Sequence, residues 1–169
     1  MRHFTHIEQF EANEFLDLAK RGLELKKNPD DIKKNGLSVV NMFYENSTRT
    51  KVSFELAERK MEFNIMNFDV STSSVNKGES LYDSVLTMKA IGMDVAVIRH
   101  QNSDYYKELE NIGISIVNAG SGNGEHPSKS LLDVMTILEH FGKVEGLNIA
   151  ISGDLKHSRL SSSNSKILH

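Results

Sequence analysis

Short apolar runs alternate with amphipathic stretches along most of the chain, and this alternation restricts the fold more than any other feature of the sequence. The apolar runs suit buried strands, which we predict over residues 37–44, 63–70, 93–98, 114–117 and 147–151. Helices are predicted between them, over residues 11–27, 47–61, 79–91, 104–111 and 126–141. Strands of this kind that alternate with helices are typical of the α/β class, with a parallel sheet flanked by helices.

The composition narrows the class of partner and of chemistry. The 169 residues suffice for one domain with a core, or for one domain and the start of a second. A net charge of −3 argues against a nucleic-acid partner, and the absence of cysteine excludes disulfides, thiolate metal sites and cysteine nucleophiles. The sequence has no apolar run of membrane-spanning length, no signal-peptide core and no histidine pattern for a metal. We therefore expect a cytoplasmic protein without a membrane, metal or cofactor partner.

Candidate functional residues gather in the loops that follow the predicted strands. Ligands of parallel α/β sheets bind at the carboxyl ends of the strands, so these loops are expected to lie together. The loops follow Tyr44, Val70, Ile98, Val117 and Ile151.

The loop after the first strand opens a helix with Ser47, Thr48, Arg49 and Thr50. Free N–H groups at a helix start attract anions, and an arginine with several hydroxyls is suited to hold a phosphate. An ordinary helix cap rich in serine and threonine explains part of this cluster equally well. It is not a Walker phosphate-binding loop, because the required glycines and lysine are absent.

The other loops each contribute one candidate cation or proton donor. Lys77 could reach an anionic substrate or could be a solvated loop lysine, and Arg99 is either an anion ligand or a surface arginine. His126 stands before Pro127 at a helix start, where a neutral imidazole could donate a hydrogen bond or simply cap the helix. Arg159 follows the last glycine-containing loop.

Five segments stand in a characteristic order: residues 43–50 (FYENSTRT), 77–80 (KGES), 98–100 (IRH), 126–127 (HP) with 130–133 (SLLD), and 153–159 (GDLKHSR). This order resembles the aspartate/ornithine carbamoyltransferase family, from about Phe4 to the last residue. The S-T-R-T segment is highly specific for carbamoyltransferases, and K-G-E-S favours those that act on aspartate.

The resemblance implies an enzyme of de novo pyrimidine biosynthesis. It would transfer the carbamoyl group of carbamoyl phosphate to the amine of L-aspartate, giving N-carbamoyl-L-aspartate and phosphate, without a metal or cofactor. Residues 1–142 would form the carbamoyl-phosphate-binding domain, and residues 143–169 the start of a truncated aspartate-binding domain. The family resemblance also implies a homotrimer with shared active sites and leaves open whether a regulatory chain binds.

The resemblance assigns roles to individual residues. The phosphate would be held by one turn, comprising Ser47, Thr48, Arg49 and Thr50. Arg99 and His126, together with Thr50, would polarise the carbamoyl oxygen, so Arg49, Thr50, Arg99 and His126 form the implied catalytic set.

Aspartate recognition is assigned to residues from two chains. Ser73 and Lys77 would enter the active site of a neighbouring subunit, where Lys77 would help to bind L-aspartate. Arg159 would bind a carboxylate of the same substrate.

Three departures from the family pattern stand near these residues. Lys129 replaces a glutamine, and lysine only donates hydrogen bonds and adds a charge. Lys129 is predicted to contact the phosphate of carbamoyl phosphate. Ser121 replaces an aspartate between two glycines, and residues 160–163 (LSSS) lack a basic residue common in the family. A non-catalytic anion-binding or assembly module, and a carbamoyltransferase for another amino acid, are the alternative interpretations.

Overall fold

The computed structural model describes residues 3–32, 36–70, 73, 78–153 and 159–167, with only the backbone of residues 159–162. The described residues contain a parallel four-stranded sheet in the order β2-β1-β3-β4. Its strands are β1 (Ser38–Phe43), β2 (Asn64–Phe68), β3 (Val95–His100) and β4 (Ser115–Ser121). The predicted α/β class with a parallel sheet is confirmed.

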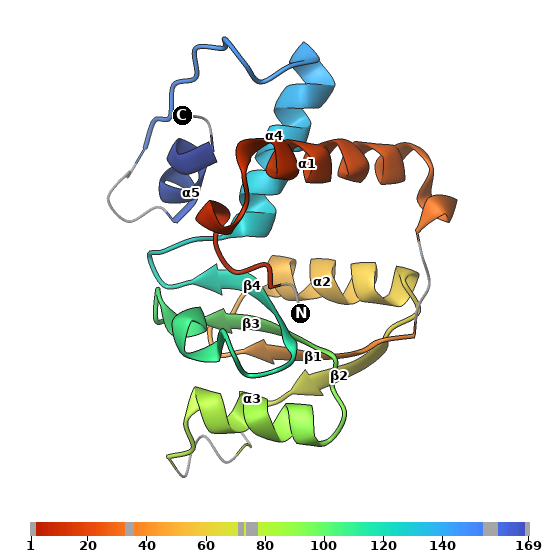
Figure 1. The fold of residues 1–169 in the computed structure, drawn as a ribbon, viewed down its shortest axis with the longest axis vertical. Helices are drawn as coiled ribbons and strands as arrows, with labels where there is room; N and C mark the ends of the chain where they lie inside the picture. The colour runs from red at the N-terminus through yellow and green to blue at the C-terminus, as the bar shows by residue number, and fades with distance from the viewer. Residues whose placement is uncertain (1–2, 33–35, 71–72, 74–77, 154–158, 168–169) are drawn as a thin grey trace.

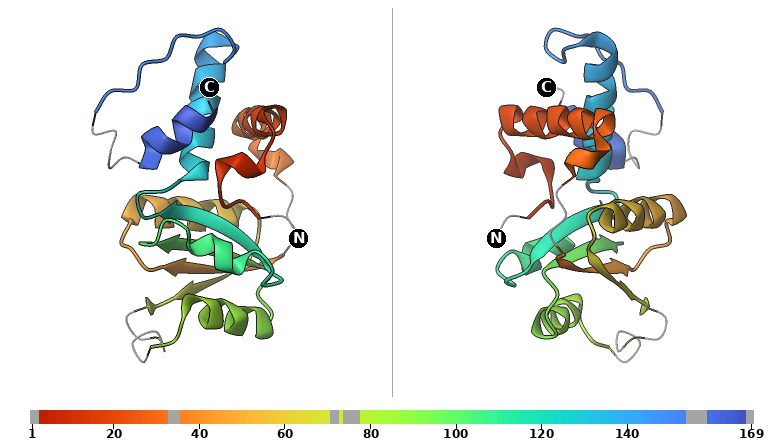
Figure 2. Two further views of the ribbon diagram at one scale, coloured as in Figure 1. Left: turned by 60° about the vertical axis from the view of Figure 1, so that its left-hand side comes forward. Right: turned by 90° about the vertical axis from the view of Figure 1, so that its right-hand side faces the viewer.

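Helices cover both faces of the sheet. The α-helices are α1 (Ala12–Lys27), α2 (Thr48–Lys60), α3 (Leu81–Ala90), α4 (Pro127–Phe141) and α5 (Arg159–Ile167). Short 3-10 helices are η1 (Ile7–Gln9), η2 (Pro29–Asp31) and η5 (Tyr105–Leu109). Figure 1 shows α2 and α3 on opposite faces, with α1, α4 and α5 gathered beyond α2, and Figure 2 shows the same layers from two other sides. Among the described residues, the helices are too short or too polar to cross a membrane.

The alternation of side chains along each strand divides the core into two layers. Val40 and Met42 of β1 belong to the cluster that includes Val85 and Met88 of α3. Val39, which precedes Val40 in the strand, packs in the cluster on the α2 side. Because successive strand residues point to opposite faces, one apolar strand supplies both layers.

A third apolar cluster joins α1 to α4. Phe15 and Ala19 of α1 pack with Val134 of α4, as the predicted apolar stripe of residues 131–138 requires. A Cβ at Gly22 would lie 2.7 Å from the sulfur of Met135, so only glycine allows this helix contact without a shift of the methionine.

The strand predicted over residues 147–151 is wrong. These residues form no strand within the described part of the chain, and Ile149 and Ile151 are 42% and 40% exposed. Figure 1 shows the segment after α4 running above the helices and away from the sheet. A short apolar run favours a strand, but a strand also needs a neighbouring strand to pair with, and the described residues offer none here.

Helix α5 was not expected from the serine-rich residues 159–167, because serine is a modest helix former.

Smaller differences concern the ends of the predicted elements. The third helix begins at Leu81 rather than Glu79, because Ser80 caps it by accepting a hydrogen bond from the Asp83 N–H at 3.1 Å. Strand β4 continues to Ser121, and the helix expected over residues 104–111 is the 3-10 helix η5.

Candidate active site

The carboxyl ends of β1, β3 and β4 meet at one edge of the sheet. Phe43 is in register with Arg99, and His100 with Ser121. The Tyr44 N–H donates to the Arg99 carbonyl at 2.8 Å, and the Gly122 N–H donates to the His100 carbonyl at 2.8 Å. The loops that lead to α2 and α4 therefore begin side by side, as the strand-end argument predicted.

The start of α2 has the hydroxyl cluster in an arrangement that does not cap the helix. Ser47 holds the N-cap position in extended backbone, but within the described residues its side chain makes no capping hydrogen bond. Its hydroxyl instead donates to Oγ1 of Thr50 at 2.9 Å. Thr48 and Arg49 are exposed beside them. The first-turn N–H groups are not taken up by Ser47, which favours an anion site over the capping interpretation.

Arg99 lies between the two loops. Its side chain is 13% exposed, donates to the Ala119 carbonyl at 3.2 Å and pairs with Glu45 at 3.2 Å. Glu45 stands in the loop before α2, whereas Ala119 belongs to β4. Arg99 is thus a fixed, largely buried cation rather than a surface arginine, and it connects the start of α2 to the strand that leads to His126.

His126 occupies the N-cap position of α4, with Pro127 as the first helical residue. The residue is 4% exposed, and its Nδ1 lies 3.2 Å from the Ser128 hydroxyl. Its backbone N–H donates to the Ser163 hydroxyl of α5 at 3.2 Å. Within the described residues the imidazole makes no capping bond, so it is held as a buried group at the helix start.

Ser121 organises the turn between β4 and α4. Its buried hydroxyl accepts from the Glu125 N–H at 3.1 Å and donates to the Glu125 carbonyl at 3.2 Å. A Cβ at Gly122 would lie 2.3 Å from the Gln101 carbonyl oxygen, and φ there is +42°, so the turn requires glycine. Serine in place of the family's aspartate therefore still closes this turn.

Lys129 is exposed in the first turn of α4, one turn beyond His126. The positive end of a helix disfavours a lysine unless an anion lies nearby. This placement is compatible with the predicted phosphate contact, which stays a prediction.

The structure does not test the residues predicted for aspartate binding. Lys77 lies outside the described residues, and only the backbone of Arg159 is described, as the first residue of α5. Ser73 follows β2, and its hydroxyl donates to the Val70 carbonyl of its own turn at 2.9 Å. The shared-site assignment involves two chains, so it stays a prediction.

His100, next to Arg99, is not a second cation of the site. Burial lowers the pKa of His100 below its ordinary value. This effect outweighs the charges of Glu108 and Glu45, which raise the pKa. Its Nδ1 accepts from the Asn102 N–H at 3.0 Å, and its ring lies 5.1 Å from that of Tyr44. A neutral imidazole packed among aromatic rings supports the strand end without adding charge.

Glu125 and its partners were missed by sequence reasoning. This carboxylate is 4% exposed, accepts from the Ile7 N–H at 2.7 Å and pairs with Lys166 of α5 at 2.7 Å. Lys166 also pairs with Glu8 at 3.2 Å. Burial lowers the pKa of Lys166, but the hydrogen bonds and charges of Glu125 and Glu8 outweigh it and raise the pKa overall. The only signal in the sequence is that Glu125 precedes His126.

Replacing Lys166 by methionine is expected to destabilise the chain by roughly 1–3 kcal/mol, because it leaves the buried Glu125 carboxylate without its cation. The loss stays below that of a fully buried pair because Lys166 is 34% exposed. Lys26→Met is the matched control, since its pair with Glu139 is about half exposed and worth less than about 1 kcal/mol. Urea unfolding measures both, and equal losses would count against a special role of Glu125.

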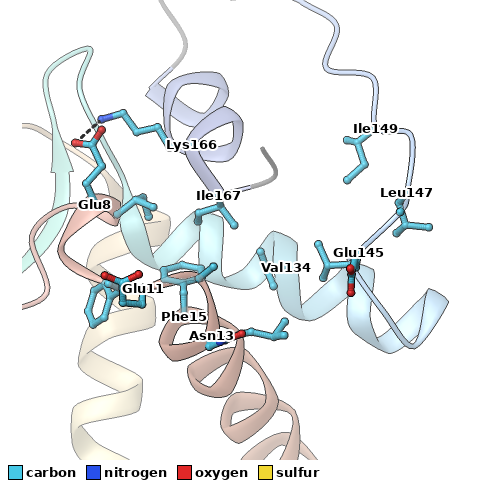
Figure 3. A pocket seen from close by; sticks show the side chains of 16 residues that line it. Glu8, Glu11, Asn13, Phe15, Val134, Glu145, Leu147, Ile149, Lys166 and Ile167 are labelled. Carbon is cyan, nitrogen blue, oxygen red and sulfur yellow. Dashed lines mark ion pairs between the residues drawn. The ribbon is translucent and has the colours of Figure 1, made fainter.

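A cavity of about 600 Å³ lies elsewhere, between α1, α4, α5 and residues 144–149 (Figure 3). Its ionisable lining residues are Glu8, Glu11, Glu145 and Lys166. The single lysine is already paired with Glu8, as the dashed line in Figure 3 marks. An acidic lining repels phosphate, so this cavity is not the candidate site.

Comparison with known proteins identifies the family of the chain. Residues 2–139 match the family model of the aspartate/ornithine carbamoyltransferase carbamoyl-phosphate-binding domain. The chain belongs to this carbamoyltransferase family. Among its curated relatives, the aspartate carbamoyltransferase catalytic subunits of Fusobacterium nucleatum and Malacoplasma penetrans are 54% and 52% identical to it. Both alignments cover 99% of this chain.

The carbamoyltransferase resemblance extends to solved structures. Aspartate transcarbamoylase from Trypanosoma cruzi, in complex with aspartate and phosphate, superposes with a TM-score of 0.90 at 35% identity over 99% of this chain. The same enzyme in complex with carbamoyl phosphate and aspartate gives the same TM-score. The chain spans 55% and 56% of the two curated relatives and 53% of these structures, or about half of their length.

Proposed function

We propose that this chain forms the carbamoyl-phosphate-binding part of an aspartate carbamoyltransferase. The reaction joins the carbamoyl group of carbamoyl phosphate to the amine of L-aspartate. Family membership and the names of the relatives support this reaction. The observation that carries the proposal is the position of Arg99, bonded on one side to Glu45 before α2 and on the other to Ala119 of β4.

The phosphate half of the substrate docks at the start of α2. The N–H groups of the first helical turn, the hydroxyls of Ser47, Thr48 and Thr50, and the guanidinium of Arg49 all carry hydrogen-bond donors suited to phosphate oxygens. These donors stabilise the negative charge that the phosphate gains as it leaves. Lys129 adds a cation at the start of α4.

The carbamoyl oxygen faces Arg99, His126 and Thr50. The aspartate amine attacks the carbamoyl carbon, and the oxygen becomes an oxyanion. The carbonyl then re-forms as the bond to the phosphate oxygen breaks, and the nitrogen gives a proton to the departing phosphate. Donors held in place before the reaction stabilise that oxyanion by a few kcal/mol each. Arg99 and His126 are largely buried, so their positions are established before substrate arrives.

The aspartate half of the site is completed by other segments. Lys77 and Ser73 are supplied by a neighbouring subunit of a cytoplasmic homotrimer, and Arg159 binds one carboxylate of aspartate. Residues 1–142 are the carbamoyl-phosphate-binding domain, and residues 143–169 begin the aspartate-binding domain. The pathway that uses the product is pyrimidine biosynthesis.

An assay of the chain joined to a second carbamoyltransferase domain tests the proposed function. Carbamoyl phosphate is supplied with either aspartate or ornithine, and the carbamoylated product is quantified. We expect carbamoyl aspartate and no carbamoyl ornithine. Product from ornithine would indicate another amino-acid substrate, and phosphate binding without product from either amine would favour the non-catalytic module.

A further inference from the structure

A buried acid and a buried amide meet between α2 and the sheet. Glu58 of α2 is 3% exposed and Asn41, in the middle of β1, is 1% exposed. The Asn41 Nδ2 donates to Glu58 Oε2 at 2.8 Å. The surrounding layer is apolar, with Val39, Val97 and Ala119 buried in it.

If Glu58 is ionised, this pair has more hydrogen-bond acceptors than donors. In the part of the chain that the structure describes, Glu58 Oε1 and Asn41 Oδ1 are both buried without a hydrogen-bond partner. Both atoms are acceptors in the ionised state, and a buried charge with a single donor is costly. One proton on Oε1 corrects this, because the carboxylic acid then has a donor for the amide oxygen. Acid and amide would then form two parallel hydrogen bonds in a closed ring.

We infer that Glu58 is protonated in the folded protein, and that its closed pair with Asn41 positions α2 on β1. The second half of the inference rests on the proposed function, because α2 carries the phosphate-binding turn at its other end. Glu58 lies about 16 Å from Ser47 along the helix at a rise of about 1.5 Å per residue, so it does not touch substrate. It is a positioning residue.

The electrostatic surroundings agree with a protonated acid. Burial raises the pKa of Glu58 above its ordinary value of 4.5, and the charge of Glu55 raises it further, against the lowering by Asn41 and Arg59. Strands β1 and β2, on which α2 packs, are fully described and contain no ionisable side chain. Within the described part of the chain, the charged groups that act on Glu58 are thus Glu55 and Arg59 of its own helix.

The sign of the pH dependence follows from the raised pKa. The folded chain holds a proton that the unfolded chain releases above pH 4.5. The contribution of the pair to stability is complete below that pH and is lost as the pH rises through the folded-state pKa. Between the two values, the unfolding equilibrium constant increases by up to about tenfold per pH unit.

Glu58→Gln tests the protonation state, because glutamine makes the same two hydrogen bonds with Asn41 and does not titrate. Urea unfolding is measured across the pH range for both chains. We expect the ratio of the wild-type to the variant unfolding constant to increase with pH. A flat ratio, or one that falls as the pH rises, would overturn the inference. Glu145→Gln, which removes an exposed carboxylate outside α2, is the control and keeps the slope.

Infrared difference spectroscopy of the folded wild-type chain against Glu58→Gln supplies a readout that does not depend on unfolding. We expect a protonated carboxyl band at neutral pH that the variant lacks, and its absence would overturn the inference. If Glu58→Gln does not fold, Glu58→Asp serves as the reference, because its shorter side chain cannot close the ring and the band is expected to shift.

Binding of inorganic phosphate to folded Glu58→Leu tests the positioning role. We expect a several-fold weaker affinity than in the wild type and in Glu58→Gln. Unchanged affinity in Glu58→Leu, with loss of binding in Arg49→Ala, would overturn the positioning role and leave the proposed function intact. Unchanged binding in Arg49→Ala would instead contradict the phosphate site and leave the Glu58–Asn41 pair standing.

Discussion

A polypeptide of residues 1–169 is expected to bind phosphate while forming no measurable carbamoyl aspartate from carbamoyl phosphate and aspartate. Aspartate has two carboxylates, and holding both requires cations on both sides of its amine. The cations proposed for aspartate within these residues are Arg159 and, from a neighbouring chain, Lys77. A polypeptide limited to these residues corresponds to about half of the relatives' length, so it holds only the start of the proposed aspartate-binding domain.

The rest of the aspartate-binding domain matters because positioning and exclusion of water provide much of the rate in such a reaction. Product formation is measured with carbamoyl phosphate and aspartate at saturating concentrations, and the same polypeptide extended by a second domain is the control. Turnover by the 169-residue polypeptide on the order of 10 per second, a common value for enzymes, would contradict the need for the second half.

The parallel sheet was predictable because its strands are local apolar runs. Val39, Val40 and Met42 are all fully buried, and from Val39 to Phe43 strand β1 is apolar except at Asn41. The rule that ligands bind at the carboxyl ends of strands then predicted that Arg99 lies near the start of α2. These conclusions depend on short segments and on one topological rule.

The partners of the site residues were not predictable, because they depend on strand register. Glu45 and the Ala119 carbonyl meet Arg99 only after β1, β3 and β4 are aligned. The same holds for Glu125 and Lys166, which are separated by 41 positions in the chain. No spacing rule relates residues so far apart.

The failed strand and the unexpected helix have a common cause. Residues 147–151 are an apolar run interrupted only by Asn148, which favours a strand, but the described residues offer them no pairing strand. Helix α5 is rich in serine, which favours a helix only modestly. It is stabilised by the ion pair of Lys166 with Glu125 and by Asn164, whose side chain donates a hydrogen bond to Asp133 at 2.7 Å. In both segments tertiary contacts decide the structure against the local pattern.

The phosphate site at the start of α2 is the central claim, and isothermal titration of inorganic phosphate into Arg49→Ala tests it most directly. Hydrogen bonds to a charged group contribute about 1.5–3 kcal/mol, so the dissociation constant is expected to increase by about tenfold to a hundredfold. Lys60→Ala removes the same charge from the opposite end of α2 and is expected to leave the constant unchanged within about twofold, since the effect of a helix end falls off within one turn. Equal affinities of the two variants would contradict a phosphate site at this end of the helix.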